Sequence, residues 1–115
     1  MNILDTLIQA IKNKQQISFE YDKEGKIKGK RIGHPYAVFI HTAKNSRVQS
    51  TKVHIVQTDG VSASEYKKPF PSFRMYDFEE LTNVAILTDR EPFSPPFHED
   101  YNSEWEGYKD IIAKV

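Results

Sequence analysis

The chain has no cysteine, and this absence excludes several kinds of chemistry. Its 115 residues can form no disulfide, no thiolate metal site and no cysteine nucleophile. No apolar run approaches the roughly 20 residues that span a bilayer. The first residues, Met1 to Asp5, lack the cationic start and continuous apolar stretch of a signal peptide. These absences predict a cytoplasmic protein with no membrane partner.

Glycine is also scarce, and its five copies are scattered, so the sequence contains no glycine-rich phosphate loop. A G-x-S-x-G nucleophile elbow is missing as well. The adjacent carboxylates Glu79 and Glu80 do not face each other on a helix or a strand, so they form no acid–base pair. None of the four histidines has the spacing of a metal-binding motif. We therefore expect no enzyme, no bound metal and no cofactor.

Apolar and aromatic residues, by contrast, are plentiful. Hydrophobic residues make up 38% of the chain and include seven Phe, six Tyr and one Trp. A single domain of this length can fold on that content without disulfides.

The spacing of the apolar residues changes along the chain. From Ile3 to Ile11 they recur at helical spacing, with Asn2 as N-cap, and the helix is expected to end near Asn13. From Ile17 onward apolar and polar residues alternate, which is typical of half-buried strands. The expected strands are 17–21, 26–32, 36–41, 48–57, 73–78 and 84–87, with a break at 33–35 and a helical turn at 79–81. Short strands joined by turns predict a closed or nearly closed β-barrel.

The last part of the chain has a different composition. Three prolines between Glu91 and Phe97 predict an extended linker. A short helix is expected over 104–114, with one apolar side formed by Trp105, Tyr108, Ile111 and Ile112. Because so short a helix is marginal alone, it must dock on the barrel or on another subunit. Residues 1–90 are thus expected to form the barrel domain, and 91–115 an acidic extension of the same structural unit.

The net charge of zero conceals a segregation of charge. The segment from Lys23 to Arg74 holds eleven Lys or Arg residues and three Asp or Glu residues, whereas the segment from Met75 onward is acidic. This segregation suits a polyanion-binding site, but the two segments would also neutralise each other if they pack together. Basic and aromatic residues interleave along the expected strands, as in barrels that bind single-stranded nucleic acids. The alternative is that the rings form the core and the cations a solvated face.

The order of these parts resembles the WYL-domain family. The matching parts, over about residues 3–88, are the first helix, the strand 17–21, Arg31 with Pro35-Tyr36, the strand around Val53-His54-Ile55, and 73–78 with its acidic turn. Val53-His54-Ile55 stands where the family has Trp-Tyr-Leu. The family usually has a DNA-binding domain ahead of this barrel. No such domain is visible in the sequence, so we expect a stand-alone member.

The resemblance implies a bacterial ligand-sensing module with an Sm-like, SH3-like barrel. Its expected partner is a single-stranded nucleic acid or a nucleotide-like anion. The family pattern places Arg31, Tyr36 and Arg74 at pocket positions, and His54 lies in the triplet segment. Lys44 and Ser46 lie in the neighbouring loop and are added to the ligand-binding set because of their charge and position.

The combined expectation is a mainly β fold with α (α+β): an N-terminal helix, a small barrel and a C-terminal extension with a short helix. We expect this domain to bind a ligand and not to catalyse a reaction. The alternative is a homo-oligomeric assembly module without a small ligand, in which the second subunit is contacted by Trp105, Tyr108, Ile111 and Ile112.

Overall fold

Helix α1 (Ile3–Asn13) begins the fold as its sequence predicts. The side chain of Asn2 accepts a hydrogen bond from the backbone N–H of Asp5 at 2.8 Å, which caps the helix. Lys14 ends it in a left-handed conformation with φ of 54°. The buried face of α1 is apolar and packs on the sheet.

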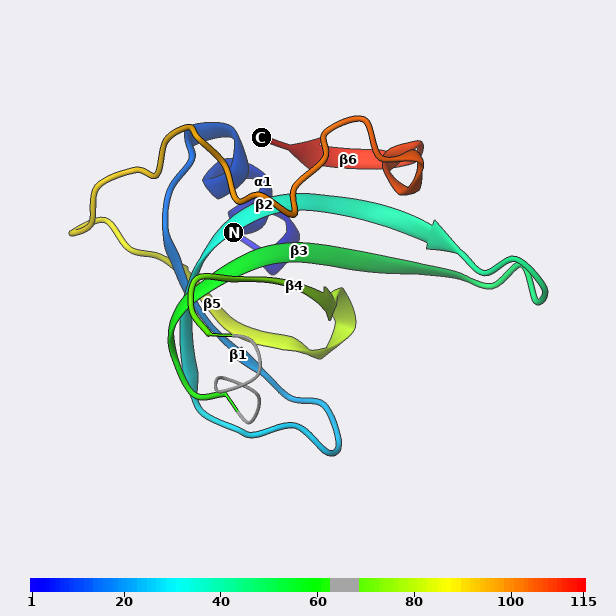
Figure 1. The fold of residues 1–115 in the computed structure, drawn as a ribbon. Helices are drawn as coiled ribbons and strands as arrows, with labels where there is room; N and C mark the ends of the chain where they lie inside the picture. The colour runs from blue at the N-terminus through cyan, green and yellow to red at the C-terminus, as the bar shows by residue number, and fades with distance from the viewer. Residues whose placement is uncertain (63–68) are drawn as a thin grey trace.

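The computed structural model describes residues 1–62 and 69–115. The strands form one antiparallel sheet in the order β4-β3-β2-β1-β5, and β6 pairs with β2 (Figure 1). The elements after α1 are β1 (Ile17–Tyr21), β2 (Lys30–Thr42), β3 (Gln49–Gly60), β4 (Ser72–Asp77), the 3-10 turn η1 (Phe78–Glu80), β5 (Leu81–Ile86), the 3-10 turn η2 (Glu106–Tyr108) and β6 (Ile111–Lys114).

This arrangement confirms a mainly β fold with one N-terminal helix. Strands β4 and β5 are the two ends of the sheet order, and η1 connects them. Among the described residues no pairing joins β4 to β5, so the sheet is open there. Closure of the barrel and its Sm-like or SH3-like character stay predictions.

Strand β2 runs through the segment that was expected to break it. Gly33, His34 and Pro35 all pair with β3 inside the strand. The pairing shifts register between Pro35 and Ala37, an irregularity that accommodates a residue without an N–H donor. The predicted break at 33–35 was therefore wrong, and β2 is instead one long central strand.

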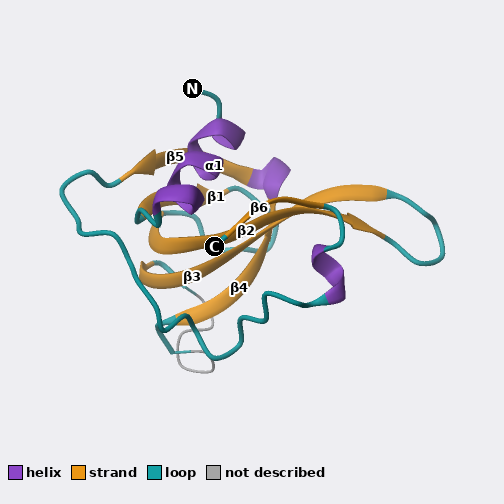
Figure 2. Cartoon of the chain, turned by 90° about the horizontal axis from the view of Figure 1, so that it is seen from above, coloured by secondary structure: helices purple, strands orange, loops and turns teal. Residues whose placement is uncertain are grey.

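The helix expected over 104–114 was also wrong. The turn η2 is followed by strand β6, which pairs with β2 at Ala37, Val38 and Phe39. Strand β1 pairs with β2 only over 30–33, so the same side of β2 offers free backbone groups farther along. The β-branched pair Ile111-Ile112 favours a strand at that position. The C-terminal extension thus packs on its own sheet, beside α1 (Figure 2).

The register of β3 with β4 separates two faces of the sheet. Paired residues point to the same face, and neighbours along a strand alternate. Val53 and Tyr76 pair on the face that packs against α1. Val56 and Phe73 pair on the opposite face, which the C-terminal extension covers.

Candidate functional site

Two arginines from different strands meet at one buried glutamine. Gln57 of β3 is completely buried. Its side-chain oxygen, Oε1, accepts hydrogen bonds from Arg31 at 3.3 Å, from Arg74 at 2.9 Å and from the hydroxyl of Tyr76 at 2.8 Å. The neutral amide therefore holds both guanidinium groups without neutralising them.

The amide of Gln57 is itself held in place. Its Nε2 donates to the backbone carbonyls of Asp59 at 3.1 Å and Val61 at 2.9 Å. These two bonds fix which end of the side chain faces the arginines. The oxygen is thereby committed to accepting from the guanidinium groups.

Arg31 of β2 is a buried cation, with 5% of its surface exposed. Its Nη2 donates to the carbonyl of Ile27 at 3.0 Å, and its guanidinium lies 5.9 and 5.8 Å from the ring centres of Tyr21 and Tyr76. Within residues 1–62 and 69–115, its Nε has no hydrogen-bond partner and no carboxylate forms an ion pair with it. A buried charge in this state gains free energy from an anion.

Arg31 and Arg74 line a pocket of about 300 Å³, here called the arginine pocket. Its other described lining residues contribute a lysine, aromatic rings and no carboxylate. They are Tyr21, Gly25, Lys26, Ile27, Ser62, Phe73, Met75 and Tyr76. Guanidinium groups match the oxygens of a phosphate, so the pocket has the chemistry of an anion site flanked by rings.

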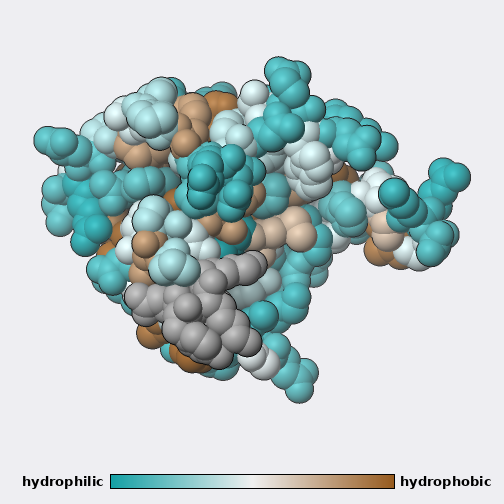
Figure 3. Space-filling view, in the orientation of Figure 1, coloured by the Kyte–Doolittle hydropathy of each residue, from teal (hydrophilic) through white to brown (hydrophobic). Residues whose placement is uncertain are grey.

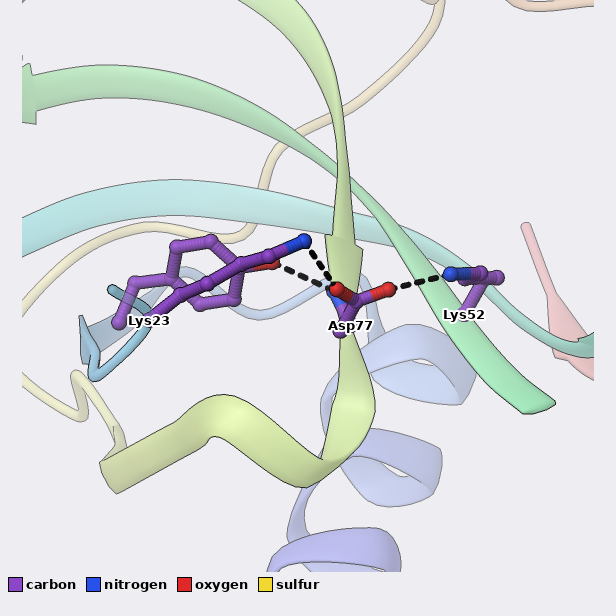
Figure 4. A network of polar contacts seen from close by, with 4 residues as sticks. Lys23, Lys52 and Asp77 are labelled. Carbon is purple, nitrogen blue, oxygen red and sulfur yellow. Dashed lines mark hydrogen bonds and ion pairs between the residues drawn. The ribbon is translucent and has the colours of Figure 1, made fainter. Parts of the chain in front are cut away.

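Asp77 connects neighbouring strand ends beside the arginine pocket through polar contacts (Figure 4). Its carboxylate forms ion pairs with Lys23, which follows β1, and with Lys52 of β3. Its backbone N–H donates to the hydroxyl of Tyr21 at 2.9 Å. Hydrogen bonds from Lys23 and Lys52 lower the pKa of Asp77 to about 2. These two lysines are therefore engaged in holding the fold.

Tyr36 lies on the other face of the sheet, outside the arginine pocket. Its ring is buried among four other aromatic rings, those of Phe73, Phe93, Phe97 and Tyr101. Its hydroxyl accepts from the backbone N–H of His98 at 2.9 Å. Burial raises the pKa of Tyr36. The structure thus brings Arg31 and Arg74 together without Tyr36, whose ligand role stays a prediction.

His54 lines a second pocket, of about 240 Å³, here called the aromatic pocket. Its described lining consists of His54, Phe73, Asp100, Asn102, Trp105 and Tyr108. Nδ1 of His54 lies 2.6 Å from the hydroxyl of Tyr108. Burial lowers the pKa of His54 to about 4, so its ring is neutral at about pH 7. The ligand role of His54 stays a prediction.

Lys44 and Ser46 lie at the tip of the hairpin between β2 and β3. This hairpin projects from the body of the domain and is mostly hydrophilic (Figures 1 and 3). Both residues are exposed, and Ser46 Oγ accepts from the backbone N–H of Val48 at 3.3 Å. Neither residue lines the arginine pocket or the aromatic pocket. Their ligand role stays a prediction.

The four residues expected to contact a second subunit do not share one helical side. Tyr108 is buried, with its ring centre 5.2 Å from that of Phe39. Trp105, Ile111 and Ile112 are each a little over one-third exposed. A subunit contact through these residues stays a prediction.

Three residues at or beside the two pockets were not predicted from the sequence, namely Gln57, Asp100 and Asn102. Gln57 carries a weak signal, because it falls at the inward position after Val53 and Ile55 in an otherwise apolar alternation. Asp100 and Asn102 carry none, since they reach their pocket only through the path of the extension. Glu65, Lys67 and Lys68, which belong to the basic central segment, lie outside the described residues.

The described part of the chain was also considered for metal-binding clusters and for membrane-spanning helices. In residues 1–62 and 69–115, no three His, Asp or Glu side chains gather closely enough to hold a metal ion. In the same residues, no helix combines the length and apolarity needed to cross a bilayer.

Comparison with known proteins adds one match. The family model of the WYL domain matches residues 2–45, which include α1, β1, β2 and Arg31. Searches of curated proteins and of solved structures gave no match. The WYL domain is generally a regulatory module that senses ligands or binds nucleic acids, and it is typically not catalytic. The resemblance to the WYL-domain family is therefore confirmed, and residues 2–45 carry it.

Proposed function

We propose that this domain is a non-catalytic regulatory module that binds a nucleotide phosphate, free or within a single-stranded nucleic acid, in the arginine pocket. The observation that carries the proposal is the sharing of Gln57 Oε1 by Arg31 and Arg74. Two guanidinium groups on one neutral oxygen form a preorganised pair of cations. A phosphate accepts from both at once.

The size and lining of the arginine pocket support a single nucleotide unit as the occupant. About 300 Å³ lies at the small end of ligand pockets, which is too little for a duplex. Lys26 is exposed at the pocket and adds a third cation for a neighbouring phosphate. Affinity in such a site is expected to fall steeply as salt displaces the phosphate contacts.

The test is a binding measurement with defined ligands. Fluorescence anisotropy with labelled single strands of about ten nucleotides, and calorimetry with nucleoside monophosphates, would be run at roughly 50 and 200 mM salt. Arg74→Gln is the main variant, because Arg74 is less buried than Arg31 and its loss threatens the fold less. We expect it to weaken binding at least about tenfold, the loss of one charge-assisted contact.

Lys12→Gln on α1 is the matched control, since Lys12 is an exposed cation that does not line the pocket. It should bind as the wild type does. Equal affinity of the wild type and Arg74→Gln, or no binding by the wild type at low salt, would refute the proposal.

A further inference from the structure

The arginine pocket and the aromatic pocket lie on either side of β4 and share a wall. Arg74 pairs with Ile55 on the face toward α1, and the next residue, Phe73, pairs with Val56 on the opposite face. Phe73 nevertheless lines both pockets. A ligand crossing β4 at Phe73 would therefore reach both pockets.

The lining of the aromatic pocket suits a flat ring and not a phosphate. Its described residues include no Lys or Arg, and His54 is a neutral ring. Trp105 is 39% exposed, and its ring centre lies 5.5 Å from that of His54 and 5.1 Å from that of Tyr108. A partly exposed indole supported from behind by other rings is a stacking surface for a base.

Polar groups at the aromatic pocket come from Asp100 and Asn102. The carboxylate of Asp100 only accepts hydrogen bonds. The side-chain oxygen of Asn102 already accepts from the backbone N–H of Glu104 at 3.0 Å, so the amide offers its N–H donors. Guanine presents two adjacent N–H donors, which match the two oxygens of one carboxylate, beside an acceptor that matches the amide.

From these features we infer that the aromatic pocket binds a nucleobase, guanine most tightly, of the same ligand whose phosphate occupies the arginine pocket. This inference rests on the proposed function and adds a base subsite to it. The base stacks on Trp105, and Asp100 and Asn102 contact its edge.

Gly107 provides a way to disturb the base subsite without changing its charge. A Cβ atom at Gly107 would lie 2.3 Å from the ring of Trp105, so the ring rests directly against the glycine. The backbone of Gly107 does not require positive φ, so alanine is tolerated by the main chain. Gly107→Ala therefore displaces the indole.

The only tryptophan of the sequence reports on this subsite directly. Its emission would be recorded while guanosine, uridine and adenosine monophosphates are added, with calorimetry on the same samples. We expect guanosine monophosphate to quench the emission and to bind at least about fivefold more tightly than uridine monophosphate, as for one good edge contact. Gly107→Ala and Asp100→Asn should each remove that preference, whereas Asp89→Asn, at an exposed carboxylate in a loop, should keep it.

The outcomes separate the two proposals. Nucleotide binding with unchanged Trp105 emission and unchanged affinity in Gly107→Ala would overturn the base subsite and leave the phosphate site standing. Quenching by guanosine monophosphate that is equally strong in the wild type and in Arg74→Gln, and that guanosine without phosphate matches, would overturn the shared ligand. Absence of any binding would overturn the proposed function and this inference with it. Quenching that weakens in both Arg74→Gln and Gly107→Ala supports both.

Discussion

Nδ1 of His54 and the hydroxyl of Tyr108 lie 2.6 Å apart, and this contact ties β3 to the C-terminal extension. Both side chains are buried. Burial lowers the pKa of His54 to about 4 and raises that of Tyr108. In the tautomer with its proton on Nε2, the neutral imidazole accepts a hydrogen bond from the hydroxyl at Nδ1, whereas a protonated ring has no lone pair left to accept one.

His54 is predicted to make the domain acid-sensitive. Its pKa is 6.5 in the unfolded chain and about 4 in the folded one, so falling pH protonates the unfolded state first. The stabilisation is complete above pH 6.5 and is lost progressively toward pH 4, by an amount on the order of 3 kcal/mol. Urea unfolding across this range measures it.

His54→Gln is the control for that titration, because it retains a polar side chain that does not ionise. The difference in unfolding free energy between wild type and variant should shrink as the pH falls from 6.5 to 4. His34, whose pKa burial also lowers, contributes equally to both proteins and cancels. A pH-independent difference would show that His54 is not the group responsible.

Asp77 is predicted to act in a lower pH window. Its pKa falls from 3.8 to about 2 because Lys23 and Lys52 bond to its carboxylate. The stabilisation is therefore present above pH 3.8 and is lost as the pH falls toward 2. Since the pairs are partly exposed, we expect roughly 1 kcal/mol. Asp77→Asn should show a constant deficit above pH 4 that closes below it; a deficit that persists at about pH 2 contradicts this account.

Gln57→Leu is predicted to destabilise the fold strongly. Leucine keeps the volume but leaves Nη1 of Arg31 and the hydroxyl of Tyr76 without their acceptor and two backbone carbonyls without their donor. We expect a loss of roughly 3 kcal/mol in the free energy of unfolding, measured by urea denaturation at about pH 7. Thr58→Val, at a half-buried neighbour on the same strand, should cost far less. Equal losses in both variants would show that the hydrogen bonds of Gln57 contribute no unusual share of the free energy of unfolding.

A pair of glycine variants tests how closely β3 approaches Arg31. Gly60 has φ of 98°, and a Cβ there would lie 2.6 Å from the Cα of Arg31. Gly25 has φ of 82° with nothing within 4 Å of such a Cβ. Gly25→Ala should cost about 1 kcal/mol from backbone strain alone. Gly60→Ala should cost about 3 kcal/mol and weaken nucleotide binding, and similar stability of the two variants would contradict the close approach.

The local elements could be predicted because their signals are local. The helical spacing and Asn2 cap defined α1, and alternation defined β1 and β4 within one or two residues. The continuation of β2 through Pro35 could not be predicted, because it depends on a register shift with β3 that accommodates the missing N–H donor of proline. Strand β6 could not be predicted either, since its secondary structure depends on pairing with the part of β2 that β1 leaves unpaired.

The candidate site could likewise be predicted only in part. Arg31 and Arg74 were identified, and the structure places both at Gln57. Tyr36 was grouped with them although its side chain lies on the opposite face, because a register shift changes which face each residue takes. The aromatic pocket depends on the fold of the C-terminal extension. It could not be predicted because a helix was expected where the structure has β6.

Phe73 would link the two subsites of the proposed nucleotide ligand. This one residue of β4 belongs to the wall of both pockets, so a shift of β4 at Phe73 that enlarges one pocket alters the other. If both pockets bind as proposed, occupancy of either would change the affinity of the other, and the effect would be the same in both directions. A sensor of that kind would respond to a whole nucleotide more sharply than to its separate base and phosphate.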